Sequence, residues 1–260
     1  MPISSSVLAR NNWRAVSSQR FEVAVLPWGA TEAHNYHLPY GTDTIQASRI
    51  AQAAAEAARL GGARVMVLPA IPYGVQSGQL DIPFCMHVNP ATQAALLRDI
   101  VGSLERHGVR KLVLVNGHGG NDFKSIIREI QPLTSVFLCT MDWYRSVSPS
   151  GYFDEPGDHA GELETSVMMH LAPDLVLPLS EAGDGAAREF TVTALREGWA
   201  WSPRKWTQVS RDTGVGDPRA ASAEKGSAYV AAVVQRIASF LVELSAMDPD
   251  AAYGSAPPEA

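Results

Sequence analysis

A short loop of the sequence carries two carboxylates and two imidazoles close together. The segment PWGATEAHNYHLPYGTDT, residues 27–44, contains Glu32, His34, His37 and Asp43. Glu32 and His34 are two positions apart, so in an extended backbone their side chains leave on the same side. Imidazole and carboxylate together are ligands of zinc, manganese and iron centres. An incidental ion pair in a solvated loop explains this stretch equally well, and Asp43 at a predicted helix start also suits a simple N-cap.

A further histidine stands between glycines at the end of an apolar run. In VLVNGHGGND, residues 113–122, His118 is flanked by Gly117 and Gly119. Glycine permits positive φ angles and close backbone approach, so the imidazole can be presented at a strand end without crowding. The segment lacks the GxGxxG pattern, and it lacks the Lys and Ser/Thr of a phosphate-binding loop. His118 is therefore a better candidate for a metal ligand than for a phosphate contact.

A third segment, GDHAGELETSVMMHL at residues 157–171, is predicted to form a helix with one apolar face. At ~100° per residue, Glu164 falls inside the arc of apolar side chains, whereas Glu162 points almost opposite. We therefore expect Glu162 on the surface and Glu164 buried. A buried carboxylate is costly unless it is paired or metal-bound, so Glu164 should bind either a metal ion or a buried arginine. Asp158 and His159, just before the helix, could cap it or face the same site.

The chemistry-bearing segments are separated by alternating strand-like and helix-like stretches. Short apolar runs rich in β-branched residues alternate with longer helix-like runs, which predicts βαβ units around a mostly parallel sheet with helices on both faces. Sites gather at the carboxyl ends of such strands, and the loops after Leu26 and Val115 both carry a candidate histidine. The predicted strands are 21–29, 63–74, 109–121 and 135–144, and the predicted helices are 44–60, 89–108, 122–133, 160–171 and 220–247.

One α/β domain accounts for most of the chain. With 260 residues, 46% of them hydrophobic, the sequence can close one large core, and we expect a single domain over residues 1–247. The last residues, 248–260, have the composition of a disordered tail. Three tryptophans lie in the polar region past Pro178, and we expect them to make core or subunit contacts rather than to stack on the substrate. They are Trp199, Trp201 and Trp206.

Charge and cysteine content indicate which kind of partner the protein binds and in which cellular compartment it is expected. The formal net charge is −6 and no lysine or arginine stripe is present, so we expect a small-molecule substrate and neither nucleic acid nor a membrane as partner. No uninterrupted apolar run approaches the ~20 residues of a transmembrane helix, and the N-terminus lacks a signal-peptide pattern. Cys85 and Cys139 form no CxxC pair, which argues against a disulfide scaffold or zinc ribbon and favours the cytoplasm.

Four separated motifs together resemble those of the creatininase family, the creatinine amidohydrolase-like proteins. GATEAHNYHLPYGTDT, VNGHGGN, HAGELETS and GVGDPRAASAEKG occur in the family's order and span roughly residues 20–235. The resemblance implies an α/β fold, a three-layer α/β/α sandwich with a mostly parallel central sheet. It also implies a homo-oligomer, commonly a hexamer, and a site for two divalent metal ions. Zn²⁺ and Mn²⁺ are the expected ions, and Fe²⁺ also suits this donor set.

The resemblance assigns roles to the residues already singled out. The family's shared ligands fall on Glu32, His34, Asp43 and His118. Asp43 is expected to bridge the two ions. Glu164 matches the acidic residue of the ETS motif and is expected to be a further ligand. His159 matches a histidine that touches the substrate or relays a proton.

The match departs from creatininase proper directly after His118. There the histidine of the NGH motif is followed by tyrosine and then by a metal-binding glutamate, whereas this chain has Gly119 and Gly120. One ligand and one substrate contact are thus absent from this motif, which argues against creatinine as the substrate. A glycine pair is usual in other branches: formamide hydrolases of deazaflavin biosynthesis, a peptide-trimming protease of mycofactocin maturation, and a hydrolase that opens a dehydro-inosose ring. AHNYHLPYGTD with SGQLDIPF is most similar to the last of these.

The resulting functional prediction is a metal-dependent hydrolase that opens a small cyclic substrate by attack of a metal-bound hydroxide on a carbonyl. Two ions ~3.5–4 Å apart can activate the water and polarise that carbonyl. A cyclic polyol ketone of the dehydro-inosose type is preferred, and an amide C–N bond is the alternative. A metal-stabilised protein without turnover is a third reading, but five candidate ligands for two ions leave positions open for substrate. His159 is preferred over Glu164 as the group that protonates the leaving atom.

Further polar side chains could contact the substrate. The long loop PYGVQSGQLDIPFCMHVNP, residues 72–90, follows a predicted strand, and such loops often cover a site. The predicted substrate-binding residues are Ser77, Gln79 and His87 of this loop, together with His37 and Asp158. Each has an alternative interpretation, because a loop histidine often bonds the backbone and the other side chains also suit an exposed surface.

Overall fold

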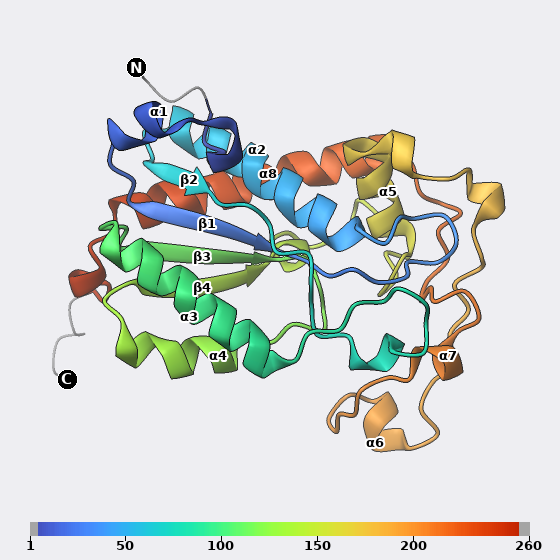
Figure 1. Ribbon diagram of the computed structural model, residues 1–260. Coiled ribbons are helices and arrows are strands. Elements are labelled where there is room, and N and C mark those ends of the chain that lie inside the picture. Colours follow the sequence, from blue (N-terminus) through green and yellow to red (C-terminus); the bar gives the residue numbers. More distant parts are fainter. Residues whose placement is uncertain (1–4, 255–260) are drawn as a thin grey trace, which may run out of the picture.

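A parallel four-stranded sheet forms the centre of the molecule (Figure 1). The computed structural model describes residues 5–254. The strands are β1 (Val23–Trp28), β2 (Val65–Val67), β3 (Lys111–Asn116) and β4 (Phe137–Asp142), in the order β2-β1-β3-β4. The register places Asn116 at the end of β3 opposite Trp28 of β1 and Asp142 of β4. The carboxyl ends of these three strands therefore lie side by side.

Helices cover both faces of the sheet. One face carries α2 (Thr42–Leu60), α5 (Glu162–Leu171) and α8 (Ala223–Ala246), and the other carries α3 (Pro90–Arg106) and α4 (Phe123–Ile130). Side chains of a strand alternate between faces, so Val23 and Val25 of β1 join the core with α2 and α8, while Ala24 and Leu26 join the core with α3 and α4. Both faces are buried, which is typical of parallel sheets. The predicted α/β fold with three layers is confirmed.

Alanine is the main residue by which α2 contacts its neighbours. The helix contacts β1 on one side and α8 on another, so it has two buried sides. Small side chains allow both neighbours to approach closely without a loss of helix propensity. The fully buried alanines of α2 are Ala47, Ala51, Ala54, Ala55 and Ala58. This close approach holds the first turn of α2, which carries Asp43, against the strand ends.

The last long helix is tied to the first residue of β3. By length and composition alone α8 could cross a membrane, but its buried side chains, among them Tyr229 and Leu241, belong to the core on the sheet. Lys111 is buried, and its ammonium group donates to the last carbonyls of α8 and to the carbonyl that follows, which closes the helix end. The acceptors are Leu244 O at 2.9 Å, Ser245 O at 2.9 Å and Met247 O at 2.7 Å.

The strand predicted over 63–74 is shorter than expected. β2 ends at Val67, and Pro69 and Pro72 follow, which have no N–H to donate to the sheet. The chain nevertheless stays beside β1, because Ile71 N donates to Pro27 O at 3.0 Å. The long loop after β2 is therefore directed to the carboxyl end of β1.

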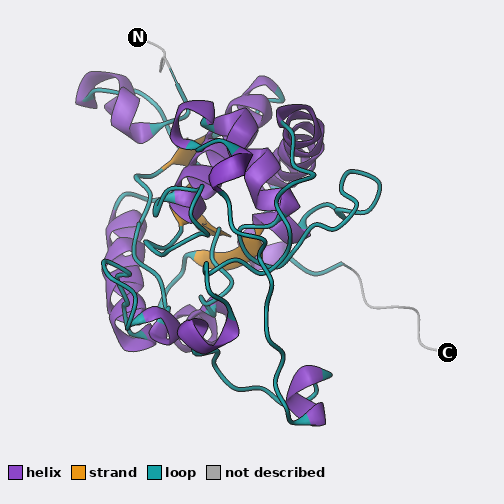
Figure 2. Cartoon of the chain, turned by 90° about the vertical axis from the view of Figure 1, so that its right-hand side faces the viewer, coloured by secondary structure: helices purple, strands orange, loops and turns teal. Residues whose placement is uncertain are grey.

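A long irregular segment joins α5 to α8. It contains η5 (Pro173–Leu175), η6 (Leu179–Glu181), α6 (Thr193–Arg196) and α7 (Trp206–Val209). Figure 2 shows from a second side that a loop carries one short helix well away from the sheet, and Figure 1 labels that helix α6. The other short helices are η1 (Leu8–Arg10), α1 (Trp13–Ser17), η2 (Ser77–Gln79), η3 (Gln131–Leu133), η4 (Trp143–Arg145) and η7 (Pro249–Ala251).

The first part of the tail expected to be disordered has local structure. Within η7 the Asp248 carboxylate accepts a hydrogen bond from the N–H of Asp250 at 3.2 Å. Arg110, just before β3, forms ion pairs with Asp248 at 3.5 Å and with Asp250 at 2.7 Å. These contacts hold the turn beside the sheet. Residues 255–260 of the predicted tail lie outside the described residues.

Candidate metal centre

Two glycines at strand ends bring the first turn of α2 to the carboxyl edge of the sheet. A Cβ on Gly29, after β1, would lie 2.5 Å from Thr44 N, and a Cβ on Gly117, after β3, would lie 2.5 Å from Asp43 O. No other residue type allows the backbone to approach so closely. The strand arrows in Figure 1 point toward this side of the molecule, where the loop before α5 also lies. Asp43 is thus placed between the loops that carry His34 and His118.

Asp43 lies between two imidazoles and presents one oxygen to each. Its Oδ1 is 3.0 Å from His34 Nε2, and its Oδ2 is 3.0 Å from His118 Nδ1. Glu32 Oε1 is 2.8 Å from the same His118 Nδ1 and 3.9 Å from His34 Nε2. All four side chains are buried. This is the arrangement expected for a carboxylate shared by two ions, and the N-cap reading does not apply, because the structure assigns Gly41 as the N-cap of α2.

Glu164 and His159 complete the cluster from the start of α5. Glu164 Oε2 accepts a hydrogen bond from Ala160 N, which holds its carboxylate at the helix start. His159 Nδ1 lies 4.0 Å from Glu32 Oε1. Three sets of ligand atoms lie within 4.8 Å of one another: Glu32 with Asp43 and His118, His34 with Asp43 and Glu164, and Glu32 with His34 and His159. All five predicted metal ligands are therefore brought together.

Each of the three histidines is oriented by its second ring nitrogen. A neutral imidazole has one N–H and one lone pair, so a ring nitrogen that donates to a carbonyl leaves the other free to bind a metal. In each case the ring nitrogen outside the cluster lies at hydrogen-bond distance from a backbone carbonyl. The pairs are His34 Nδ1 with Glu32 O at 3.1 Å, His118 Nε2 with Val75 O at 2.9 Å, and His159 Nε2 with Ala33 O at 2.9 Å.

The buried charges shift the protonation of the cluster strongly. Burial acts to lower the pKa of His34, but the Asp43 carboxylate, with help from Glu164 and Glu32, raises it to about 10. Burial also acts to lower the pKa of His118, but Glu32 and Asp43 hold it well above its ordinary value. Burial acts to raise the pKa of Asp43, but His34 and His118 hold it well below the ordinary value. Burial, reinforced by Asp43, raises the pKa of Glu164.

This donor set suits divalent metal ions. A neutral imidazole whose lone pair faces a carboxylate is repelled by it, so the cluster needs a positive charge between the two groups. Protons can supply that charge, which is why the pKa values of His34 and His118 are raised. Ions such as Zn²⁺ and Mn²⁺ bind the same nitrogen and oxygen atoms, and they replace these protons when they bind.

The prediction that Glu162 lies on the surface is wrong. Its side chain is fully buried, and its Oε2 accepts hydrogen bonds from the backbone N–H groups of Asp154 at 3.0 Å and Glu155 at 2.9 Å. Lys225 of α8 forms an ion pair with its Oε1 at 2.5 Å. The sequence argument assumed one buried face for this helix, but α5 contacts both α2 and α8. Glu162 therefore holds the loop that carries His159.

Gln79 and His37 are buried beside the cluster, but their hydrogen bonds are made to the protein. Gln79 Nε2 donates to Glu32 Oε2 at 2.7 Å. His37 Nε2 lies 2.8 Å from Thr165 Oγ1. Burial first, and then the charge of His34, lower the pKa of His37 to about 4.

The other three residues expected to bind substrate are Ser77, His87 and Asp158, and their role in substrate binding stays a prediction. Ser77 is exposed. His87 Nδ1 accepts from Gln76 N at 3.0 Å, and its Nε2 lies 3.0 Å from Asn89 Oδ1. Asp158 is exposed and is paired with Arg204. The hydrogen bonds of His87 and the ion pair of Asp158 are made to residues outside the cluster.

Two aromatic residues beside the cluster were not among the predicted site residues. The ring of Trp206, in α7, lies 4.6 Å from that of His159, and the ring of His34 lies 4.2 Å from His159 as well. The Tyr144 hydroxyl is 3.8 Å from the position that a Cβ on Gly119 would take. Burial, with Asp142 and then Asp43 and Glu164 nearby, raises the pKa of Tyr144, so the phenol keeps its proton. No sequence pattern marks either residue.

Gly120 has no room for a side chain in this backbone. A Cβ at this position would lie 2.1 Å from Val75 O and 2.4 Å from His118 Nε2. Both atoms belong to the hydrogen bond that orients the His118 ring. A glutamate at this position, which the resemblance attributes to creatininase proper, is therefore sterically incompatible with this arrangement of the loop before residue 76.

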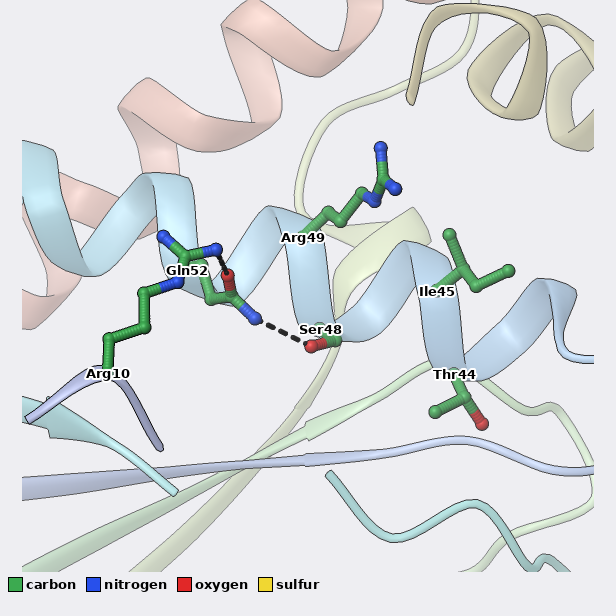
Figure 3. A pocket seen from close by; sticks show the side chains of 6 residues that line it. All are labelled: Arg10, Thr44, Ile45, Ser48, Arg49 and Gln52. Atoms are coloured by element: carbon green, nitrogen blue, oxygen red, sulfur yellow. Dashed lines mark hydrogen bonds between the residues drawn. The ribbon is translucent and has the colours of Figure 1, made fainter. Parts of the chain in front are cut away.

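A surface hollow on α2 is separate from the cluster. It has a volume of about 470 Å³, and Figure 3 shows the side chains along it. Arg10 donates to Gln52 Oε1 at 3.1 Å, and Gln52 donates to Ser48 Oγ at 2.9 Å, so these polar groups bind one another (Figure 3). None of the clustered carboxylates or imidazoles lines this hollow. The cluster is therefore the stronger candidate for chemistry.

Curated proteins with related sequences include amide and peptide hydrolases. The creatinine amidohydrolase of Pseudomonas putida is 32% identical over 59% of this chain and 66% of its own length. The mycofactocin precursor peptide peptidase of Mycobacterium tuberculosis is 31% identical over 81% of this chain and 80% of its own. The 3-dehydro-scyllo-inosose hydrolase of Thermotoga maritima is 25% identical over 60% of this chain and 52% of its own.

Solved structures match nearly the whole chain. A protein from Bacteroides fragilis, whose assignment as a creatinine amidohydrolase is itself provisional, superposes with a TM-score of 0.89 at 46% identity, over 94% of this chain and 97% of that one. A mutant creatininase described as Zn-Zn type superposes with a TM-score of 0.74 at 26% identity, over 94% and 100%. The family model for creatininase, creatinine amidohydrolase, matches residues 9–241. This chain, with its buried cluster of histidines and carboxylates, belongs to the creatininase family of hydrolases.

Proposed function

We propose that the protein is a dinuclear-metal hydrolase that cleaves a bond at a carbonyl carbon. The observation that carries the proposal is the orientation of three buried imidazoles, each anchored to a backbone carbonyl and each facing carboxylates with its other nitrogen. Such anchoring is the usual support of metal-binding histidines, here His34 and His118, and it also fixes the ring of an imidazole that transfers a proton, here His159. A structural salt-bridge cluster has no need for three oriented imidazoles.

We assign the proposed ligands to two ions. Glu32, Asp43 and His118 would hold one ion, and His34, Asp43 and Glu164 would hold the other. Asp43 is common to both sets because each of its oxygens faces a different imidazole. Three protein ligands for each ion leave positions open for water and substrate. Zn²⁺ and Mn²⁺ are the proposed ions, since one related creatininase structure is described as Zn-Zn type and another as a Mn form. Fe²⁺ is a further candidate, because it shares the same ligand preferences.

His159 is the proposed catalytic proton donor. Two bound metal ions would supply a water nucleophile near neutral pH and would polarise the substrate carbonyl. The His159 Nε2 is committed to Ala33 O, so Nδ1, which faces Glu32, is the ring atom that can carry a proton to the leaving atom. Its ring is held in place by the neighbouring rings of His34 and Trp206. Glu164, with its raised pKa, would take this role only if it were not a ligand.

An amide C–N bond is the first candidate for cleavage. Among the related proteins, a creatinine amidohydrolase and a peptide peptidase are both more than 30% identical to this chain. A cyclic polyol ketone, preferred from the sequence, is the second candidate, because the Thermotoga maritima inosose hydrolase also matches, at lower identity and over half its length. In either case the attacked atom is a carbonyl carbon, and only the leaving atom differs.

Small-molecule binding and self-association complete the proposal. A homo-oligomer, as expected from the resemblance, would cover exposed apolar side chains such as Trp13, Phe84 and Trp201. Light scattering on the purified protein measures the mass of the assembly directly. A monomer at micromolar concentration would contradict this part of the proposal and leave the metal chemistry unaffected.

Metal removal and reconstitution test the proposed function. Dialysis against a chelator should abolish turnover, and Mn²⁺ or Zn²⁺ should restore it. The substrate arm compares a creatinine, formamide and short-peptide set with a set of cyclic polyol ketones on the same metal-loaded protein. His118→Ala should lower metal content as measured by elemental analysis. Full turnover in the metal-free protein would exclude the mechanism, whichever substrate is cleaved.

A further inference from the structure

Gln79 is a buried amide whose orientation is fixed by its neighbours. It lies at the end of η2 and has no exposed surface. Its Oε1 accepts hydrogen bonds from Ala33 N at 3.2 Å and from Cys85 Sγ at 3.1 Å. Because the backbone N–H of Ala33 can only donate, the amide oxygen must face it. The NH₂ group therefore points toward the Glu32 carboxylate, 2.7 Å from Oε2.

This contact makes the two oxygens of Glu32 unequal. Oε2 is occupied by the Gln79 amide. Oε1 faces the three imidazoles, at 2.8 Å from His118, 3.9 Å from His34 and 4.0 Å from His159. A carboxylate can bind an ion through one oxygen or through both. With Oε2 held by a donor, binding through Oε1 alone is favoured.

We propose that Gln79 is a positioning residue that makes Glu32 a one-oxygen metal ligand. The inference rests on the proposed function, because it assumes that Glu32 binds an ion. Its consequence for the reaction is that one coordination position, which a second Glu32 oxygen would otherwise take, stays open for water or substrate. This role replaces the direct substrate contact that the sequence suggested for Gln79.

The loop around Gln79 is held by contacts that do not involve its side chain. Met86 N donates to Thr31 O at 3.0 Å, and Val75 N donates to Asn121 Oδ1 at 3.0 Å. Gln76 of the same loop is also buried, and its amide donates to Thr31 O rather than to a carboxylate. Gln76 is therefore a matched control: the same residue type, loop and burial, without a contact to a proposed ligand.

The test compares Gln79→Met with Gln76→Met in the full-length protein. Metal affinity is measured by competition with a chromophoric chelator, and coordination by the visible absorption of the Co²⁺-loaded protein. We expect Gln79→Met to lose about 10- to 100-fold in affinity, the usual cost of removing an outer partner of a ligand. The Co²⁺ bands should also weaken, because these bands lose intensity as the coordination number rises. Gln76→Met should keep the wild-type spectrum and affinity within about threefold, since it removes no such partner.

The outcomes separate this inference from the proposed function. If wild-type protein binds no ion, both fail. If wild-type protein binds ions and Gln79→Met keeps its affinity and spectrum, only the role of Gln79 is overturned. Equal losses in the two variants would likewise overturn it, because they would reveal a general effect on the loop. Gln79→Leu, measured in parallel, replaces Gln79→Met if that variant does not fold.

Discussion

Asp43 Oδ1 lies 3.0 Å from the Nε2 of His34, and both side chains are buried. The other oxygen of the same carboxylate faces His118 at the same distance. A single side chain thus belongs to both candidate ligand sets, whereas Glu164 belongs to only one. The two carboxylates should therefore respond differently to substitution.

The first prediction concerns metal stoichiometry. Asp43→Asn should release both ions, because the shared negative charge between the two imidazoles is lost, whereas Glu164→Gln should retain the ion held by Glu32 and His118. Elemental analysis after gel filtration in metal-free buffer gives the number of ions per chain. Equal metal content in the two variants would mean that Asp43 does not bridge.

The second prediction concerns Trp206 and the position of His159. Trp206→Ala removes the ring that lies 4.6 Å from the imidazole of His159 and should lower kcat by about tenfold while metal content is unchanged, because His159 loses its fixed orientation. Trp201→Ala is the matched control, since Trp201 lies in the same irregular segment and is 84% exposed. Steady-state kinetics and elemental analysis are measured on both. A similar loss in the two variants would point to a general effect of the irregular segment.

The third prediction concerns the buried ion pair between Glu162 and Lys225. Glu162→Gln should lower the free energy of unfolding by about 1–3 kcal/mol. The buried carboxylate accepts hydrogen bonds from two backbone N–H groups and forms an ion pair with Lys225, and the substitution removes the negative charge that these contacts need. Urea denaturation measures the change. Glu155→Gln, at an exposed neighbouring position, should be neutral. An unchanged free energy of unfolding in Glu162→Gln would contradict the stabilising role of this ion pair.

The fourth prediction is a pH dependence of stability caused by His37. Its folded pKa is about 4, below the value of 6.5 for an unperturbed histidine. As pH falls through 6.5, the unfolded state takes up a proton that the folded state resists, so stability should fall between pH 6.5 and 4 and level off below. His37→Gln should flatten this part of the profile relative to wild type. His107→Gln, on an exposed histidine, should not.

These profiles are measured as urea midpoints in the presence of chelator, so that metal binding does not contribute. The cluster is the same in both proteins, so the difference between wild type and His37→Gln isolates His37. Parallel profiles for the two proteins would contradict the lowered pKa.

The strands and the helix that position the site could be predicted from the local pattern of apolar residues. The apolar runs and the alanine-rich stretch predict β1, β3 and α2 because burial on both faces of a sheet and close helix packing select such residues. The strand over 63–74 was overestimated, since prolines at 69 and 72 end the hydrogen-bond ladder early. Glu164 lies beside the cluster as expected, although it is half-buried rather than buried. Glu162 was misplaced, because a helix packed on two sides has no single outer face.

The contacts that tune the ligands could not be read in this way. Gln79 was recognised as a polar residue near the site, but its amide faces Glu32 only because Ala33 and Cys85 occupy its oxygen. Trp206 reaches His159 from an irregular segment with no periodicity to extrapolate. Both contacts join residues far apart in the chain, so no spacing rule predicts them.

The crowding around Gly120 bears on how branches of this family can interconvert. A side chain at position 120 and the hydrogen bond from His118 to Val75 O compete for the same space. The effect of a glutamate at position 120 therefore depends on the conformation of the loop before residue 76. Introduced alone, the glutamate would displace the imidazole of His118, so the loop would have to move first. Exchanging glycine for glutamate at this position therefore requires a change in the backbone of the loop before residue 76.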